Sequence, residues 1–227
     1  MPTTRTYADA CPIARALDVI GERWALLVVR ELLLGGQRFS DLRQALPGAS
    51  SNMLTDRLRE LDSNGVVHRR RLAPPAASWV YELTDRGRAL DPVVDALGVW
   101  GSAEAPGETA GLSATSVLLF LRGSARVHPN PPQGTYRLGL DDRVWTLAPG
   151  AGGLEIAPGA PPAPDAAIDT DPRTLNALLT GHVTLEAAIG DGSVQIDGDL
   201  AALRALLSVT ADRPASHVVL TPARGRS

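Results

Sequence analysis

The sequence predicts an α+β fold in two domains. Three observations predict it: two helical runs followed by a hairpin pattern near the N-terminus, a stretch rich in Ser, Ala, Glu, Pro, Gly and Thr without apolar periodicity, and alternating strand-like segments beyond that stretch. A chain of 227 residues accommodates one or two domains. We expect a first domain over residues 1–102, a linker over residues 103–112 and a second domain over residues 113–220.

The helices at the centre of the first domain follow from apolar spacing. Apolar residues recur at helical spacing on both sides of a Pro-Gly break: Phe39, Leu42 and Leu46 before it, and Leu54, Leu58 and Leu61 after it. Ser50 is a natural N-cap of the second helix, because its hydroxyl can accept an amide hydrogen bond from the first turn. Gly65 ends that helix, where a positive φ is needed. The pattern predicts two amphipathic helices that share one buried seam.

A hairpin pattern follows the second helix. Val66 and Val67 lead into three consecutive arginines, and the chain returns through residues 79–83 after a turn that contains Pro74 and Pro75. Two short β-rich runs around such a turn make a wing. The region is therefore predicted to be a winged helix-turn-helix. We expect the wing arginines to lie near the phosphate backbone or the minor groove of DNA.

The second helix also has a polar face that suits DNA. Opposite its leucines it carries Ser51, Asn52, Thr55, Asp56, Arg59 and Ser63. Asn and Arg can pair with base edges in the major groove, whereas Ser and Thr suit phosphates or thymine methyl groups. A plain solvated helix face is the alternative. The residues predicted to contact DNA are Arg38, Ser50, Ser51, Asn52, Thr55, Arg57, Arg59, Arg69, Arg70 and Arg71.

Charge supports DNA binding only locally. Residues 37–71 contain seven arginines and four acidic residues, a local balance of +3, although the whole chain has a formal net charge of −3. Attraction to nucleic acid must therefore come from a focused patch. Strong unspecific binding to DNA is not expected.

Three stretches in order carry a family resemblance. They are CPIARALDVIGERWALLVVRELL, RFSDLRQALPGASSNMLTDRLRELDSNGVV and WVYELTDRGRALDPVVDALGVWG. Over residues 11–101 the chain resembles the HxlR family of bacterial winged-helix transcription regulators. The resemblance implies a dimeric DNA-binding domain, with the helix from Ser50 as recognition helix and dimer contacts from the first and last helices. Asn52 is a departure, because the family often has a basic residue there, and without that basic side chain the target sequence and the affinity would differ.

Apolar spacing also predicts helices on both sides of this region. The run before it, expected to build the domain core, is Ile13, Leu17, Ile20, Trp24, Leu27, Val28, Leu32 and Leu33. The run after it, which Thr84 can cap, is Leu90, Val93, Val94, Leu97 and Trp100. One small domain cannot easily cover this last stripe, so we expect a partner subunit to cover it. Two copies would place two recognition helices about one DNA turn apart, and the expected operator is an inverted repeat.

Beyond the linker the pattern predicts a sheet combined with helices. A helical run over residues 117–121 precedes three alternating segments, TYRLGL, RVWTL and GLEIA, which predict an antiparallel meander. A strand in DAAIDTD, a helix over residues 172–179, a strand in GSVQIDGD and a helix over residues 200–207 follow. Over about residues 113–210 this arrangement resembles sterol carrier protein type-2-like domains. The resemblance implies an apolar cavity for lipids or other hydrophobic ligands; a filled core is the alternative.

Composition argues against several kinds of enzyme. All 22 basic residues of the Lys+Arg count are arginine, so lysine-dependent phosphate loops and Schiff-base chemistry are excluded. The four histidines, His68, His128, His182 and His217, stand too far apart for a recognised metal motif. The acid pairs Asp141-Asp142, Asp169-Asp171 and Asp197-Asp199 lie in predicted turns or helix starts, where Asp bonds the backbone. We expect no catalytic site, metal or cofactor.

Cys11 is the single cysteine and precedes the first helix. A thiol near a helix N-terminus tends to have a lowered pKa, which favours oxidation. Its position matches an N-terminal cysteine frequent in the resembling regulators, some of which sense oxidants or electrophiles through it. A small buried residue at a dimer interface is the alternative. The sequence has no signal peptide and no apolar run of about 18 residues, so we expect a cytoplasmic protein that does not enter a membrane.

Three functions are compatible with these patterns. The favoured one is a homodimer that binds duplex DNA at an inverted-repeat operator, with a C-terminal domain that binds a hydrophobic effector and a linker that transmits its effect. In the second, the C-terminal domain serves only dimerisation or spacing. The third is an enzyme or lipid carrier with an incidental helical domain, and it lacks an assembled catalytic constellation.

Overall fold

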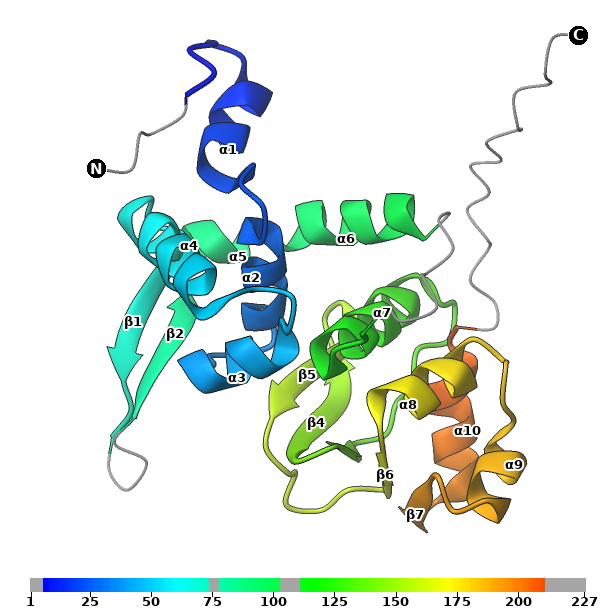
Figure 1. Cartoon of the computed structure of the whole chain (residues 1–227). Coiled ribbons are helices and arrows are strands. Elements are labelled where there is room, and N and C mark those ends of the chain that lie inside the picture. Colours follow the sequence, from blue (N-terminus) through cyan, green and yellow to red (C-terminus); the bar gives the residue numbers. More distant parts are fainter. Residues whose placement is uncertain (1–5, 74–77, 103–110, 211–227) are drawn as a thin grey trace, which may run out of the picture. The chain divides into compact units, whose positions relative to one another are not determined.

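The chain folds into two compact units, here described from a computed structural model (Figure 1). The structure describes residues 6–73, 78–102 and 111–210. The first unit contains the described residues up to Val94 together with Ser113–Ser116, and the second contains the other described residues. The fold is α+β, as predicted. Most of the predicted linker, the Pro74-Pro75 turn and the end of the predicted second domain lie outside the described residues.

The first unit is a helix-turn-helix followed by a hairpin, which confirms the prediction. Its elements are α1 (Pro12–Ile20), α2 (Ala25–Leu32), α3 (Phe39–Ala45), α4 (Ser51–Ser63), β1 (Val67–Arg71), β2 (Trp79–Leu83), α5 (Asp85–Arg88) and the start of α6 (Asp91–Gly101). The core is apolar and includes Val28, Val29, Leu42, Leu54, Leu58, Leu61, Val67 and Leu83. Gln37 extends the two-stranded sheet by pairing with Tyr81 at its edge.

The N-terminal apolar run forms two separate helices and not one continuous helix. Trp24 takes a left-handed conformation with φ of 77°, which turns the chain between α1 and α2. Gly48 leaves room for the Trp24 ring, because a Cβ atom at position 48 would lie 2.8 Å from it. Ile20 at the end of α1 is buried in the core, whereas the first part of the helix lies away from it. Ile13 is 71% exposed and Leu17 is also exposed, so the prediction that they belong to the core is wrong.

The helix predicted after Thr84 is also two helices. The Thr84 hydroxyl accepts a hydrogen bond from the amide of Gly87 at 3.1 Å and caps only the short α5. Pro92 lacks an amide hydrogen, which the first turn of a helix does not need, and a new helix begins at Asp91. α6 has no buried residue, and Trp100 near its end is 70% exposed. Of the predicted apolar stripe, Leu90 and Val94 pack against the core of the first unit, whereas Val93, Leu97 and Trp100 are exposed.

The second unit contains a five-stranded sheet with helices. Its elements beyond α6 are α7 (Ala114–Val127), β3 (Tyr136–Leu140), β4 (Arg143–Gly150), β5 (Gly153–Pro158), β6 (Ala166–Thr170), α8 (Pro172–Leu179), α9 (Leu185–Gly190), β7 (Gln195–Gly198) and α10 (Leu200–Ser208). The strand order is β5-β4-β3-β6-β7. The predicted meander is confirmed, since β3, β4 and β5 pair antiparallel. β6 pairs parallel to β3, and α9 is an element that the sequence analysis did not identify.

The two faces of this sheet differ in polarity. Alternation along β3 places the buried Tyr136, Leu138 and Leu140 on one face. Arg137 lies on the other face, where its Nη1 donates to both carboxylate oxygens of Asp169 at 2.9 and 2.7 Å. Helix α10 packs on β6 and on α8. One apolar core therefore lies between one sheet face and the helices, while the opposite face is polar.

Candidate nucleic-acid interface

Helix α4 is fixed at both ends, as the sequence predicts. The amide of Met53 donates to the Ser50 hydroxyl at 3.2 Å, which makes Ser50 the N-cap. Gly65 follows the helix with a φ of 67°, a conformation that favours glycine. Three leucines, Leu54, Leu58 and Leu61, are buried beneath the helix. The outward face of α4 is therefore held in a defined orientation.

The outward face of α4 carries two exposed side chains whose hydrogen-bonding groups could contact base edges. Asn52 and Arg59 are exposed, and Ser51 and Thr55 are half-buried beside them. The Thr55 hydroxyl donates to the backbone oxygen of Ser51 at 2.8 Å, so its methyl group and remaining lone pair are left for a partner. Arg59 has one ionic neighbour, Asp56, at 3.5 Å. An exposed pair of this length is weak and leaves the guanidinium available.

Arg57 lies differently from the prediction. It is 9% exposed, and its guanidinium pairs with Glu60 of the same helix and, at 3.7 Å, with Glu22 of the turn before α2. This burial and pairing favour a structural role for Arg57, and the phosphate contact expected there stays a prediction.

Arg43 is a residue that the sequence analysis did not include. It is exposed on α3, and its Nη1 donates to the Ser51 hydroxyl in the first turn of α4. It also lines an open surface hollow with Phe39, Ser40 and Gln44. The signal was present in the sequence, since Arg43 is one of the seven arginines between residues 37 and 71. Arg38 is exposed at the start of the same helix, where its backbone amide donates to the Asp41 carboxylate at 3.0 Å.

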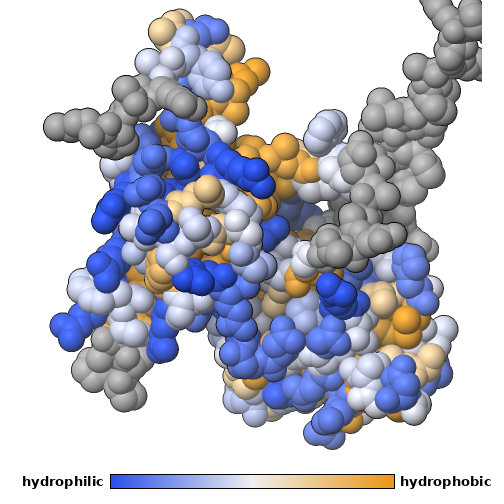
Figure 2. Space-filling view, in the orientation of Figure 1, coloured by the Kyte–Doolittle hydropathy of each residue, from blue (hydrophilic) through white to orange (hydrophobic). Residues whose placement is uncertain are grey.

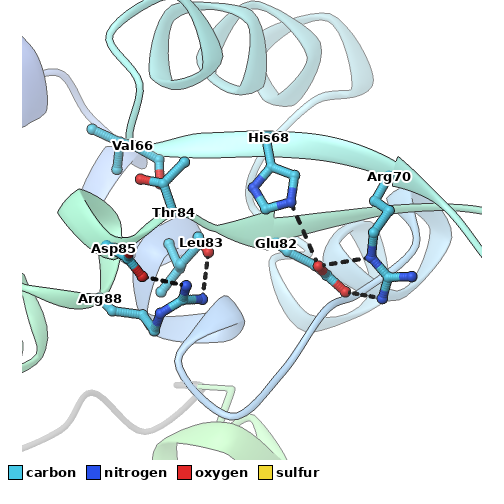
Figure 3. A network of polar contacts seen from close by, with 8 residues as sticks. All are labelled: Val66, His68, Arg70, Glu82, Leu83, Thr84, Asp85 and Arg88. Carbon is cyan, nitrogen blue, oxygen red and sulfur yellow. Dashed lines mark hydrogen bonds and ion pairs between the residues drawn. The ribbon is translucent and has the colours of Figure 1, made fainter.

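The three wing arginines do not share one environment. Figure 3 shows Glu82 of β2 between His68 and Arg70 of β1. Arg70 donates to both oxygens of that carboxylate, from Nε at 3.0 Å and from Nη2 at 2.5 Å, and His68 Nε2 lies 3.6 Å from it. The hydrogen bond from Arg70 lowers the pKa of Glu82, and that carboxylate raises the pKa of Arg70. The charge of Arg70 is thus already paired with a carboxylate, and its expected DNA contact stays a prediction.

Arg69 contacts aromatic rings instead of a carboxylate. Its Cζ lies 4.5 Å from the centroid of the Trp79 ring and 6.0 Å from that of Tyr81. Arg69 and Arg71 are both exposed. Figure 2 shows mostly hydrophilic side chains over α4 and the hairpin, and apolar side chains at the surface of α6.

Cys11 stands at the N-cap of α1 and is exposed. The nearby backbone amides of Ala14 and Ile13 lower the pKa of its thiol, although the sulfur makes no capping hydrogen bond in the described part of the chain. A lowered pKa increases the thiolate fraction at neutral pH. Both expected roles of Cys11, redox sensing and packing at a dimer interface, remain predictions.

Two of the three acidic pairs of the second unit include a residue that caps a helix. Asp171 caps α8 and Asp199 caps α10, as expected for Asp at helix starts. Within the described residues no three His, Cys, Asp or Glu side chains are grouped so as to hold a metal. None of the described helices has the length and apolar character needed to cross a membrane.

Comparisons with known proteins support the resemblance of both regions. Residues 19–108 match the family described as HxlR-like helix-turn-helix, and residues 130–210 match the SCP-2 sterol transfer family. The chain is 38% identical over 96 residues to YvaP of Bacillus subtilis (strain 168), an uncharacterized HTH-type transcriptional regulator, in a match that covers 42% of this chain and 89% of YvaP. It is 37% identical over 97 residues to a second such regulator of that strain, YybR, covering 42% of this chain and 76% of YybR. A solved structure, the redox regulator HypR in its oxidized form, is 35% identical with a TM-score of 0.40, covering 43% of this chain and all of that one.

Proposed function

The chain belongs to the HxlR-like helix-turn-helix family, and from this premise we propose that it is a homodimeric transcription regulator that binds an inverted-repeat operator. The observation that carries the proposal is the presentation of α4, which is capped at Ser50, anchored by buried leucines and polar on its outward face. A helix held in this way beside an arginine-bearing hairpin has the parts needed to enter the major groove while the hairpin reaches the backbone.

The contact residues divide into two groups. Asn52 and Arg59 read base edges, because both are exposed on α4, and the Asn52 amide offers a donor and an acceptor while the Arg59 guanidinium offers paired donors. The groups assigned to phosphates are Arg38, Arg43, Ser50, Ser51, Thr55, Arg69 and Arg71. Arg57 is assigned to the fold of the domain because it is buried and ion-paired.

Dimerisation is supported by the apolar surface of two helices. Ile13 and Leu17 of α1 are exposed, as are Leu97 and Trp100 of α6. Monomeric proteins rarely expose large apolar side chains together on two helices, so a partner subunit is proposed to cover them. A two-fold dimer would present two copies of α4 to successive major grooves, which is why the operator is an inverted repeat.

The C-terminal unit is proposed to bind a hydrophobic effector. Trp145 is fully buried, and its indole Nε1 has no hydrogen-bond partner within the described residues. An unpaired buried donor is costly, and an acceptor on a bound apolar ligand would satisfy it. The effector would act by binding one conformation of the dimer better than another.

A second candidate keeps DNA binding but makes the C-terminal unit a spacing or dimerisation module. It is favoured by the filled core of this unit, in which Leu118, Leu121, Leu138, Leu147 and Ile168 are fully buried. A filled core needs no ligand to be stable.

The proposal is tested by footprinting purified full-length protein on chromosomal fragments that it retains. We expect a protected region with two-fold symmetry, occupied by two chains and lost steeply as salt is raised. Protection by a single chain of an asymmetric site would contradict the dimer, and absence of any protected fragment would contradict DNA binding.

A further inference from the structure

The wing strands place their arginines on two different faces. Side chains alternate along a strand, so Arg69 and Arg71 share one face and Arg70 lies on the other. The register of the hairpin pairs Arg69 with Tyr81 and Arg71 with Trp79, which puts both aromatic rings on the face of Arg69 and Arg71. Three consecutive arginines are thus divided by the strand geometry.

The face of Arg70 is electrically neutralised. Arg70 holds Glu82 through two hydrogen bonds, at 3.0 and 2.5 Å. The Glu82 side chain also lies against Gly36, where a Cβ atom would come within 2.6 Å of its Cγ, so only glycine leaves room for it there. A phosphate that approached Arg70 would also approach this carboxylate. Arg70 therefore adds little net charge to the attraction between the wing and DNA.

On the opposite face the charge of Arg69 is not paired with a carboxylate of the described residues, and an aromatic ring supports its side chain. The Cζ atom of Arg69 lies 4.5 Å from the centroid of the Trp79 ring, a cation–π contact. Such a contact does not use up the five N–H donors of a guanidinium, which can still donate to an acceptor. Trp79 is 48% exposed, so its ring is not needed to fill the core and is available as a support for Arg69.

We propose that the wing contacts DNA through one face only, with Arg69 and Arg71 as the contacting cations, Trp79 as the positioning residue of Arg69, and Arg70 retained by Glu82 as part of the hairpin. This inference rests on the proposed function, because it assigns the contacts of the same DNA-binding surface. It distinguishes neighbouring residues that the sequence alone makes equivalent.

The three arginines supply their own matched controls. Full-length Arg69→Gln, Arg70→Gln and Arg71→Gln proteins would be titrated with a duplex of random sequence over a range of salt concentrations. Each phosphate contact contributes about 0.9 to the slope of log affinity against log salt. We expect Arg69→Gln and Arg71→Gln each to lower the slope by about that amount. Arg70→Gln should leave the slope unchanged and lower the melting temperature. An equal slope reduction for Arg70→Gln would overturn the division of faces.

The role of Trp79 is tested by a double-mutant cycle. We expect Trp79→Leu to weaken binding about three-fold, because the stacked support is worth only a modest energy at an exposed site. Trp79→Phe keeps a ring and should restore most of that affinity. In protein that already carries Arg69→Gln, Trp79→Leu should cause no further weakening, since the ring acts through Arg69. An undiminished effect in that background would mean that Trp79 contacts DNA or a partner by itself.

Failure of this inference can be separated from failure of the proposed function. If wild-type protein binds no duplex at low salt, the regulator assignment is wrong. If wild-type protein binds with a steep salt slope and the three arginine variants behave alike, DNA binding stands and the one-faced wing is wrong.

Discussion

Nη2 of Arg57 lies 3.7 Å from Oε2 of Glu22, so α4, the proposed recognition helix, is tied to the turn that precedes α2. The same guanidinium pairs with Glu60 one turn along α4. Arg57 is buried, whereas both of its partners are partly exposed. This arrangement orients α4 from its inward side and leaves its outward side to Asn52 and Arg59.

Replacing Arg57 by alanine should destabilise the first unit rather than remove a DNA contact. Removal of a buried, charge-assisted pair and of the packed side chain costs about 1–3 kcal/mol of unfolding free energy. Urea unfolding of the full-length protein measures this loss of unfolding free energy. Arg59→Ala, an exposed change on the same helix, is the control and should stay within about 0.5 kcal/mol. Unchanged stability together with a smaller salt slope would return Arg57 to the phosphate contacts.

The wing should lose stability in acid through Glu82. The hydrogen bond from Arg70 lowers the pKa of Glu82 more than partial burial raises it, and His68 and Arg88 add attraction. A carboxylate whose folded pKa is depressed contributes stability above its unfolded pKa, and that contribution disappears as the pH falls through the folded pKa. The melting temperature of wild-type protein should therefore fall more steeply below the ordinary glutamate pKa than that of Glu82→Gln. Parallel curves for the two proteins would contradict the pairing.

A charge introduced into the apolar stripe of α6 should break the dimer. Leu97→Asp places a carboxylate where a partner is proposed to cover an exposed leucine, and burying it there is costly. Sedimentation should then show a shift to monomer, with weaker operator binding. Ile189→Asp in α9 is the matched control, because Ile189 is similarly exposed but lies outside α1 and α6. A monomeric wild-type protein, or equal effects of the two changes, would remove the proposed interface.

Removing the indole N–H of Trp145 should separate the two roles proposed for the C-terminal unit. Trp145→Phe deletes an unpaired buried donor, so the ligand-free protein should be as stable as wild type or more stable. With oleate as probe, the melting temperature of wild-type protein should rise by mass action, and the rise should be smaller for the variant. No rise in either protein would favour the spacing module, and equal rises would show that Trp145 does not hold the ligand.

Local features were predictable because they depend on neighbouring residues. The Ser50 cap, the end of α4 at Gly65 and the meander of β3, β4 and β5 follow from capping, backbone freedom and alternation. The side on which α1 lies was not predictable, because the apolar spacing of Ile13 and Leu17 does not say whether their own chain or a partner covers them.

The features that could not be predicted depend on contacts between residues that are distant in the sequence. Arg57 turns inward because the fold brings Glu22 beneath it, and Arg70 is neutralised because the hairpin register brings Glu82 beside it. Neither pairing is visible in the local pattern, in which each arginine stands among polar residues. The short α9 was missed because six residues are too few to establish a helical period.

Sequencing of the duplexes that purified full-length protein retains from a random pool tests the central claim most directly. For wild-type protein we predict enrichment of one inverted repeat whose half-sites lie about one DNA turn apart. For Arg59→Ala we predict the same symmetry with relaxed choice at one position of each half-site and about ten-fold weaker binding. A pool that stays random after selection with wild-type protein, or an unchanged motif and affinity with Arg59→Ala, would contradict recognition of DNA through α4.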